Sequence, residues 1–203
     1  AKGEGAGNIP EVAKKLAEES AAEVEALFDD NTRMAFITAG MGGGTGTGAA
    51  PVVARIAKEK GVLTVGIVTI PFLFEGEPKI LQAFAGVEEM RKHVDALLVI
   101  NNERLCKIYP DLSWTTAFAK ADDSLSNAAR RIAELVSKDG KINLDFADVR
   151  TTLKDGGAAV ISTGSGEGEH RMSRAIQNAL TSPLLKESDI YGAERVLFNL
   201  YFS

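Results

Sequence analysis

One glycine-rich run carries the strongest chemical signal in the sequence. It follows an apolar, strand-like run at 34–38, precedes a helical pattern that starts at Val52, and consists of Gly42, Gly43, Gly44, Thr45, Gly46, Thr47 and Gly48. Glycines let a backbone close around an anion, and a helix N-terminus offers unpaired N–H groups at its positive end. The two threonines add hydroxyl donors without adding charge. The run therefore predicts a phosphate-binding loop between a strand and a helix.

The two common phosphate motifs do not match this run. The dinucleotide-binding spacing G-x-G-x-x-G is absent, because no three glycines between positions 40 and 48 have it. The motif G-x-x-x-x-G-K-[ST] fits only in its glycines, since Ala49 and Ala50 stand where the lysine and the hydroxyl belong. A flexible linker is the simple alternative, but linkers are not framed by an apolar strand and an amphipathic helix. The spacing also argues against a dinucleotide-dependent oxidoreductase.

A second cluster of residues able to do chemistry lies at 143–148. Asn143, Asp145 and Asp148 stand close together just before a helical pattern. The simplest interpretation is a helix start, with Asn143 or Asp145 as the N-cap and Asp148 in the first turn. Carboxylates at this spacing could also hold a cation or a water molecule. From these residues alone, both interpretations stay open.

Composition excludes several other classes of function. The chain has 203 residues, a formal net charge of −5 and one cysteine, Cys106. An acidic chain argues against nucleic-acid binding, and a lone cysteine cannot form an internal disulfide, which fits a reducing compartment. With only His93 and His170 besides, a zinc site or a Cys–His nucleophile is poorly supported. No apolar run is long enough to cross a bilayer, so no membrane insertion is expected.

The elements that must position these residues alternate along the chain. Strand patterns at 34–38, 62–69 and 96–100 are separated by helical patterns that end near Lys60 and His93. This alternation predicts a doubly wound α/β fold with a parallel sheet. Further patterns predict a helix at 10–28 with an apolar stripe, a long helix at 113–136, helices at 148–154 and 172–180, and strands at 158–163 and 195–201.

Two runs give the sequence a specific resemblance to a known family. The run 42–48 and the run 143–150, Asn-Leu-Asp-Phe-Ala-Asp-Val-Arg, are both similar to hallmarks of FtsZ, the bacterial tubulin-like division GTPase family. Looser matches occur at 3–11, 71–76, 101–105 and 182–185, so the resemblance extends from Gly3 to Ser203. It implies a three-layer Rossmann-like parallel sheet of tubulin/FtsZ type, a long central helix, and part of a smaller α+β C-terminal subdomain.

The resemblance also implies a nucleotide site that binds GTP or GDP with Mg²⁺. Glu75 would accept hydrogen bonds from the ribose, Phe118 would stack on guanine, and Asp122 would bind the edge of the base. Lys79 is the one basic candidate near the phosphates, although a lysine on the surface at a helix start is an equal alternative. The remaining nucleotide-binding residues implied are Asn102, Gly5, Ala6, Gly7 and the seven residues of the run 42–48.

Catalysis in the family depends on a second molecule. The resemblance implies that Asp145, Asp148 and Asn143 are catalytic and act on the nucleotide of the next subunit in a head-to-tail filament. They would position the water that attacks the γ-phosphate, while Mg²⁺ neutralises charge. The resemblance further implies a cytoplasmic protein of the mid-cell division ring. The alternative is a nucleotide-binding or assembly-dead filament module without turnover.

The resemblance divides the chain into three parts. Residues 1–112 correspond to a GTP-binding subdomain, 113–140 to the central helix and 141–203 to a C-terminal activation subdomain. The family pattern has a further strand–loop–helix unit before the first part and more strands after the last one. We therefore expect this chain to be a fragment, or half of a split protein. The family's tail that binds other division proteins is likewise expected to be absent.

Overall fold

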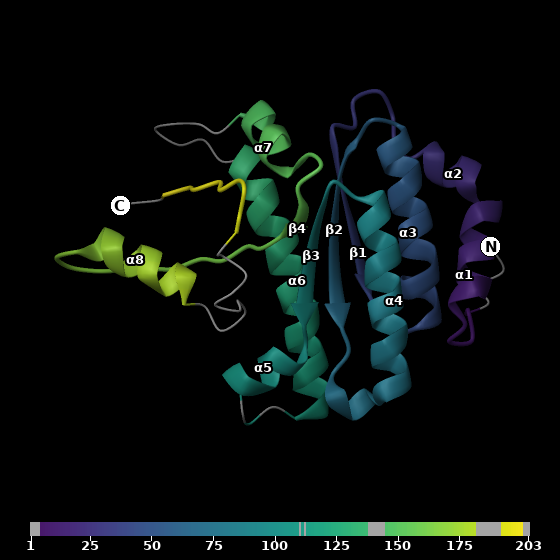
Figure 1. Cartoon of the computed structure of the whole chain (residues 1–203), viewed down its shortest axis with the longest axis horizontal. Coiled ribbons are helices and arrows are strands. Elements are labelled where there is room, and N and C mark those ends of the chain that lie inside the picture. The colour runs from purple at the N-terminus through teal and green to yellow at the C-terminus, as the bar shows by residue number, and fades with distance from the viewer. Residues whose placement is uncertain (1–4, 110, 112, 138–144, 182–191, 201–203) are drawn as a thin grey trace.

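The structure is a computed structural model that describes residues 5–109, 111, 113–137, 145–181 and 192–200. Figure 1 shows three layers, with a parallel sheet between helices on both faces. The sheet has the order β1-β2-β3-β4, and every neighbouring pair is parallel. The predicted three-layer α/β fold is confirmed.

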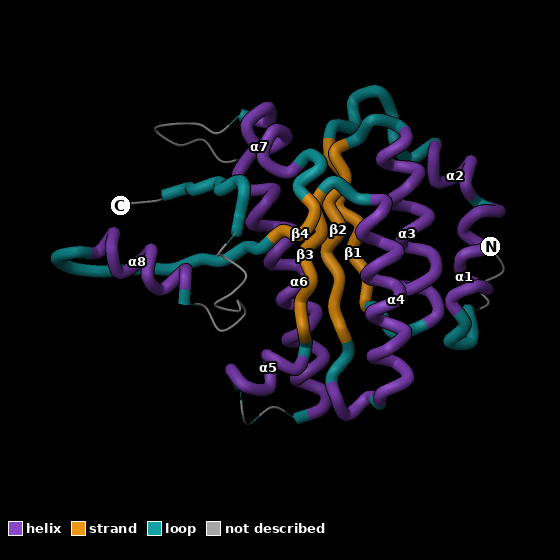
Figure 2. Tube along the Cα trace, viewed as in Figure 1, coloured by secondary structure: helices purple, strands orange, loops and turns teal. Residues whose placement is uncertain are grey.

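The central strands are β1 (Met34–Gly40), β2 (Leu63–Ile70) and β3 (Ala96–Asn101), drawn in orange in Figure 2. Their register places Met34 opposite Leu63, and Val65 opposite Ala96. Every residue of β2 is buried, as expected for a strand covered by helices on both faces. The three strand patterns that the sequence predicts at these positions are confirmed within two residues at each end.

Helices α3 (Gly44–Glu59) and α4 (Glu77–His93) cover one face of the sheet, and α1 (Pro10–Glu19) lies outside α3 (Figure 1). The core on this face joins side chains of both helices to alternate strand residues, among them Ala54, Met90, Val68, Ile70 and Leu97. Gly61 ends α3 with a φ of +78°, a backbone conformation that glycine adopts without strain. The predicted helix end at Lys60 is therefore confirmed.

The opposite face is covered by the long helix α6 (Trp114–Ser137). Ala128 and Ile132 of α6 pack on Val65, Ile67 and their neighbours in β3. Alternate residues of β2 thus face α6 or α4, which is the side-chain periodicity of a strand. The short helix α5 (Glu103–Ile108) and the 3-10 turn η1 (Leu73–Glu75) follow β3 and β2 at their carboxyl ends.

The remaining elements are α2 (Ala21–Glu25), α7 (Phe146–Leu153), β4 (Gly157–Ala159) and α8 (Arg171–Leu180). The strand predicted at 158–163 is shorter than expected, and it pairs with β3 in the same sheet. The strand predicted at 195–201 is wrong over its described part, because residues 195–200 have no assigned strand and join no ladder of the described sheet. Alternating apolar residues give a strand only where a partner strand completes the hydrogen bonds.

The apolar stripe predicted along 10–28 lies partly in solvent. Val12 is 40% exposed, Leu16 is 44% exposed and Leu27 is 76% exposed, whereas the small Ala13 is buried. The helix breaks at Ser20 between α1 and α2. α1 therefore contacts α3 through small groups that allow close approach, and its larger apolar side chains lie partly in solvent.

Candidate functional site

The turn between β1 and α3 lies at the carboxyl edge of the sheet. After Gly40, Met41 and Gly42 form the turn, and Gly43 serves as the N-cap of α3 with extended backbone. Within the described part of the chain, this helix has no side-chain cap at its N-terminus. Its N–H groups and the positive end of its dipole are therefore available to an anion.

The phosphate-binding run is mostly helix rather than loop, which corrects the prediction that the helix begins near Val52. Thr45, Gly46, Thr47 and Gly48 lie in the first turns of α3. A Cβ on Gly46 would overlap the carbonyl oxygen of Gly40, and one on Gly48 would overlap the carbonyl of Pro10. Glycine costs about 1 kcal/mol relative to alanine inside a helix. Here the close approach of two backbones, rather than flexibility, requires it.

Residues 5–9 lie directly against the start of α3. A Cβ on Gly44 would be 2.8 Å from the Cβ of Ala6 and 2.8 Å from the amide nitrogen of Ile9. Ala6 is buried, and Gly7 and Asn8 have φ angles of +55° and +63°. The structure thus brings Gly5, Ala6 and Gly7 beside the run 42–48, as the sequence predicts for one composite site.

Gly42 and Thr47 shape the turn before α3. The hydroxyl oxygen of Thr47, which is buried, accepts a hydrogen bond of 2.9 Å from the Gly42 amide. Gly42 has a φ of +97°, and a Cβ there would be 2.8 Å from the carbonyl oxygen of Lys79. The Thr47 hydroxyl therefore holds the turn, whereas Thr45 is exposed. That the two hydroxyls donate to a phosphate stays a prediction.

The segment after β2 forms a second wall at the same edge. Glu75 accepts a 3.0 Å hydrogen bond from the amide of Phe72, and its other oxygen lies 3.3 Å from the ammonium of Lys79. The two charged residues predicted to bind ribose and phosphate are therefore paired with each other. Glu103, to which the sequence assigned no role, accepts a 3.0 Å hydrogen bond from the amide of Leu73. An acidic residue one position after Asn102 was the available signal.

Aromatic side chains connect this wall to α6. Phe118 meets Phe72 edge to face with 5.5 Å between ring centroids, and Phe72 stacks on Phe74 at 4.9 Å. Phe118 is 42% exposed, so part of its ring is free to contact another molecule. Asp122 lies one turn further along α6 and is exposed. The structure thus places Phe118 beside the segment that carries Glu75.

Asn102 is the most unusual polar residue at this edge. It follows β3, is 5% exposed, and donates its backbone N–H to the carbonyl of Ile70 at 3.1 Å. Among the described residues its side-chain oxygen has no hydrogen-bond partner. Buried polar atoms almost always have a partner, so an unpaired one indicates a place where a ligand or a water molecule binds.

The acidic residues predicted to be catalytic lie at the opposite edge of the sheet. Asp145 is the N-cap of α7, and the two aspartates form a capping box. The amide of Asp148 donates to Asp145 at 2.9 Å, and the amide of Asp145 donates to Asp148 at 3.3 Å. The helix-start interpretation is confirmed, with Asp145 rather than Asn143 as the cap. Asn143 itself lies outside the described residues.

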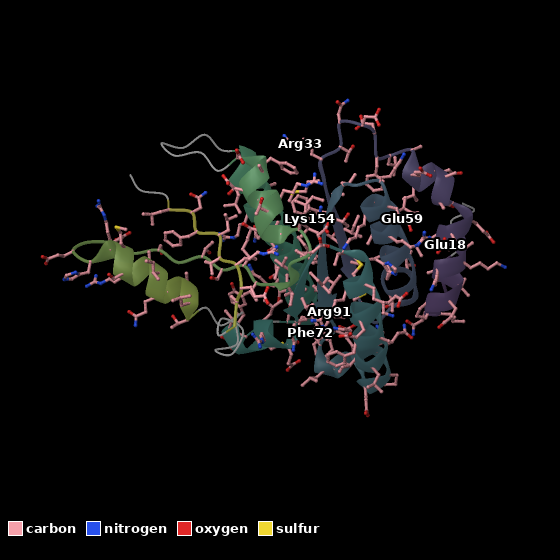
Figure 3. All side chains as sticks on the ribbon, turned by 45° about the horizontal axis from the view of Figure 1, so that its top comes forward. Glu18, Arg33, Glu59, Phe72, Arg91 and Lys154 are labelled. Carbon is pink, nitrogen blue, oxygen red and sulfur yellow. The ribbon has the colours of Figure 1, made fainter. Side chains whose placement is uncertain are left out.

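Figure 1 shows the separation of the two sites, with α7 at one end of the strands and α5 at the other. Figure 3 labels Arg33 near the first end and Phe72 near the second. Both aspartates are exposed, and the capping box uses one oxygen of each. Each carboxylate therefore keeps an oxygen that can face another molecule. They cannot reach the glycine-rich edge of their own chain.

Two searches of the described residues bear on cofactors and membranes. They contain no group of three or more histidine, cysteine or acidic side chains arranged to hold a metal ion. No described helix is both long and apolar enough to cross a bilayer.

Two family models match the chain. The tubulin/FtsZ family GTPase domain matches residues 1–110, and the FtsZ family C-terminal domain matches residues 157–202. The sequence is 68% identical over 200 residues to the cell division protein FtsZ of Porphyromonas gingivalis, an alignment that covers 98% of this chain and 44% of that protein. The chain spans about half the length of the curated relatives it matches.

Solved structures show the same fold. The FtsZ dimer of Methanocaldococcus jannaschii matches with a TM-score of 0.84 and 47% identity, over 91% of this chain and 53% of that one. CetZ1 from Haloferax volcanii, solved as a GDP-bound monomer, matches with a TM-score of 0.73 and 26% identity, over 89% of this chain and 55% of that one.

Proposed function

Because this chain belongs to the tubulin/FtsZ family, we propose that it supplies the phosphate-binding and activating parts of a GTPase that assembles head to tail. One observation carries the proposal. The glycine-rich edge and the exposed carboxylates of Asp145 and Asp148 lie at opposite ends of the same parallel sheet. Two such chains stacked end on end would bring the carboxylates of one to the glycine-rich edge of the other.

We propose that the carboxyl edge binds GTP or GDP. The first turn of α3, with residues 5–7 beside it, would receive the phosphates on backbone N–H groups. Phe118 would stack on the base. Asp122 would accept hydrogen bonds from two N–H donors on the Watson–Crick edge of guanine, a pair of donors that adenine lacks. The unpaired oxygen of Asn102 supports this assignment, because it is buried at the same edge.

We further propose that Glu75 and Lys79 exchange partners when nucleotide binds. In the structure they are joined at 3.3 Å, so neither charge is free. The pair is partly exposed, and such pairs are weak, generally below about 1 kcal/mol. A ribose hydroxyl and a phosphate can therefore replace it, with Glu75 accepting from the ribose and Lys79 facing the phosphates.

Mg²⁺ fits this site only in company with the nucleotide. Mg²⁺ in nucleotide sites keeps several waters and is held largely by phosphate oxygens. The described part of the edge offers hydroxyl and amide oxygens, such as those of Thr45 and Asn102, but no cluster of carboxylates. When bound, the ion would neutralise charge on the phosphates, and this chain's own residues would orient the nucleotide around it.

Hydrolysis would be completed by the neighbouring subunit. We propose that Asp145 and Asp148, with Asn143, position and polarise the attacking water against the nucleotide held by the next chain. The match to an FtsZ dimer supports an assembly of like chains. The resemblance to proteins named for cell division extends the proposal to a cytoplasmic filament at the division site.

Two substitutions at one position test this function in the full-length polypeptide that carries this sequence. Asp148→Asn keeps an oxygen that can accept from the Asp145 amide, and so keeps the helix cap. It is expected to leave stability and GTP affinity unchanged and to lower turnover by a factor of about 100 or more. Asp148→Ala is expected to lower turnover equally and to cost about 1 kcal/mol of stability as well. Full turnover in Asp148→Asn filaments would show that the carboxylate is not part of the reaction.

A binding module without turnover is the second candidate. It is favoured by one observation, that Asp145 and Asp148 cap α7 through each other's amides, a structural role that needs no catalysis. This candidate predicts GTP binding without phosphate release at any protein concentration. The head-to-tail GTPase instead predicts that phosphate release per subunit rises with concentration as chains assemble.

A further inference from the structure

Helix α7 is too small to fix its own position. It has 8 residues, and Val149 is the one fully buried among them. Isolated helices of this length are unstable in water, so contacts with the rest of the protein must hold it. Yet its first turn presents Asp145 and Asp148, whose placement decides whether they can meet a neighbouring molecule. The contacts that hold α7 therefore bear on function.

The first of these contacts is at the N-terminal end of α7. The guanidinium carbon of Arg33 lies 3.9 Å from the centre of the Phe146 ring, and Phe146 stands directly after Asp145. A guanidinium at this distance over an aromatic face is attracted by the ring and stacks on it. Arg33 immediately precedes β1, so it is attached to the sheet (Figure 3). This contact fixes the beginning of α7 against the amino edge of the sheet.

The second contact is at the C-terminal end of α7. One guanidinium nitrogen of Arg195 donates to three backbone carbonyls, those of Lys154 at 2.7 Å, Thr151 at 3.1 Å and Thr152 at 3.4 Å. The last carbonyls of a helix have no partner within the helix, and they form the negative end of its dipole. A cation that binds several of these carbonyls caps the C-terminal end of the helix. Arg195 comes from the segment 192–200, which is far from α7 in the sequence.

We propose that Arg33 and Arg195 form a clamp on α7 and act as positioning residues for Asp145 and Asp148. The inference rests on the proposed function of these aspartates. Neither arginine would touch the nucleotide. Each acts through α7: Arg33 through the ring of Phe146, and Arg195 through the carbonyls at the opposite end. A shift of about 1 Å in the geometry of a reaction can cost about 100-fold in rate, so loss of either contact lowers turnover.

The variant Arg195→Gln tests the clamp in the full-length polypeptide that carries this sequence. It is expected to lower GTP turnover in filaments about tenfold or more with unchanged affinity for GTP. Arg195→Lys keeps one positive charge at the carbonyls and is expected to retain most of the turnover. Arg171→Gln, on α8, removes an exposed arginine away from α7 and serves as the matched control, with turnover unchanged.

A mixing experiment separates positioning from a general loss of structure. Arg195→Gln subunits keep an intact nucleotide edge, and Asn102→Ala subunits keep intact acidic residues. The GTP concentration is chosen so that nucleotide binds to the Arg195→Gln subunits but not to the Asn102→Ala subunits. The mixture is then expected to turn over GTP several-fold faster than the two variants assayed separately. The same mixture made with Asp148→Ala in place of Arg195→Gln tests the proposed function itself.

The outcomes of the mixing experiment are distinct. If GTP turnover rises when Asn102→Ala subunits are mixed with Asp148→Ala subunits and also when they are mixed with Arg195→Gln subunits, the clamp is supported. If turnover rises only in the mixture with Asp148→Ala, the clamp is overturned, because Arg195 would then act on its own subunit's nucleotide edge or on folding. Recovery with neither overturns the action of the aspartates on a neighbour, and the clamp with it.

The other end of the clamp is tested by a double-mutant cycle. Arg33→Gln and Phe146→Leu are each expected to lower turnover several-fold, and the double variant is expected to be no slower than the slower single variant. Arg33→Lys, which can still lie over the ring, is expected to restore much of the rate. Fully multiplicative losses in the double variant would show that Arg33 does not act through Phe146.

Discussion

The two edges of the sheet are built in different ways. The carboxyl edge consists of backbone groups brought close together, with glycine at each point of contact and with Asn102 buried beside them. At the amino edge, the short helix α7 presents the acidic side chains of Asp145 and Asp148 in solvent. At one edge the shape is fixed by sterics, and at the other it is fixed by a few polar contacts.

Because of this difference, substitutions at the two edges are expected to have different effects on stability and activity. A side chain added at Gly46 or Gly48 must move backbone, because the nearest atoms to both are main-chain carbonyls. Substitution of these two glycines is expected to destabilise the fold and the site together. A change at the amino edge removes a cap or a charge but leaves the sheet intact. Damage there is expected to lower activity with little effect on stability.

The strongest test of this comparison is Gly46→Ala. Its new Cβ would overlap the carbonyl oxygen of Gly40, so β1 and α3 must separate. The expected loss is about 3 kcal/mol or more of unfolding free energy, measured by urea denaturation, together with loss of GTP binding. Gly43→Ala is the control, because nothing lies within 4 Å of its Cβ position and its φ is −97°. It is expected to cost less than about 1 kcal/mol.

Asn102→Ala separates binding from stability at the same edge. Because the Asn102 oxygen has no partner among the described residues, its removal is expected to change stability by less than about 1 kcal/mol. Affinity for GTP is expected to fall about tenfold, as measured by calorimetry. The neighbouring variant Asn101→Ala should instead lower stability and leave GTP affinity unchanged, since the Asn101 oxygen accepts a hydrogen bond from the Glu103 amide at 3.0 Å. Equal affinity losses in both would contradict a ligand role specific to Asn102.

At the amino edge, Asp145→Ala removes the cap of α7 and the hydrogen bond from the Asp148 amide. We expect a loss of about 1 kcal/mol in stability, with faster hydrogen exchange confined to α7 and unchanged GTP affinity. Asp145→Asn keeps a capping oxygen and should restore the stability. A loss of nucleotide affinity in either variant would contradict the separation of the two edges.

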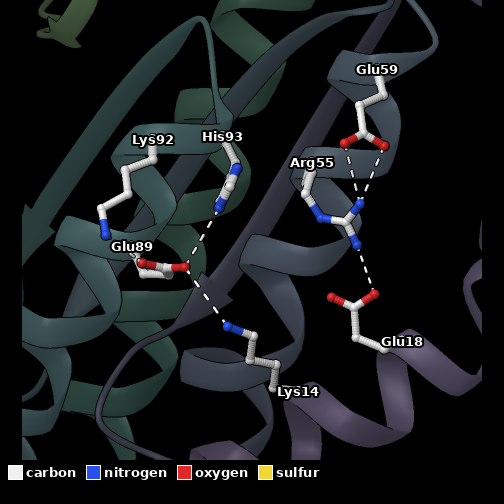
Figure 4. Close-up of polar contacts among 7 residues, drawn as sticks. All are labelled: Lys14, Glu18, Arg55, Glu59, Glu89, Lys92 and His93. Atoms are coloured by element: carbon white, nitrogen blue, oxygen red, sulfur yellow. Dashed lines mark hydrogen bonds and ion pairs between the residues drawn. The ribbon is translucent and has the colours of Figure 1, made fainter.

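The smallest expected effect concerns α1, which lies outside α3 and adds ion pairs with α3 and α4 to its packing contacts. Figure 4 shows Arg55 of α3 bound to Glu18 at 2.7 Å, and Glu89 of α4 near Lys14 at 3.9 Å. The pKa of Glu89 is lowered, chiefly by the hydrogen bond from Lys92, with help from His93 and Lys14. Because Lys92 lies on α4 itself, the pH-dependent contribution of Glu89 acts mainly within α4, and a smaller part reaches α1 through Lys14.

The sign of that contribution follows from the lowered pKa. Stabilisation by Glu89 is present above its ordinary pKa of 4.5 and is lost as the pH falls through the lower value in the folded protein. Because the side chain is 36% exposed, the effect is expected to stay below about 1 kcal/mol. Glu89→Gln should abolish this part of the pH dependence of the urea midpoint. A pH dependence identical to that of the unsubstituted chain would show that Glu89 contributes nothing.

Much of the fold was predictable because its signals are local. β2 is a mostly apolar run without charged residues between Gly61 and Pro71, and strands of this kind lie inside parallel sheets. The family resemblance assigned residues 5–7, Glu75 and Asn102 to one nucleotide site, and the structure brings all of them to the carboxyl edge of the sheet. The capping box of α7 was likewise visible in the spacing of Asp145 and Asp148.

The rest was not predictable because it depends on contacts between distant segments. Glycines in the run 42–48 suggest a loop, and only the positions of Gly40 and Pro10 show why a helix carries them. The pairing of Glu75 with Lys79 competes with the ligand roles that their residue types suggest. Arg195 lies more than forty positions from the carbonyls that it binds, and no local sequence pattern predicts such a contact.

The separation of Asp148 from the glycine-rich edge determines how many complete catalytic sites a filament can contain. If each reaction needs the edge of one chain and the acids of the next, a filament always contains one completed site fewer than it has subunits. A lone chain has none, and the chain at one end keeps its nucleotide uncleaved. Turnover per chain then reports mean filament length, and the two ends of every filament differ chemically without any further component.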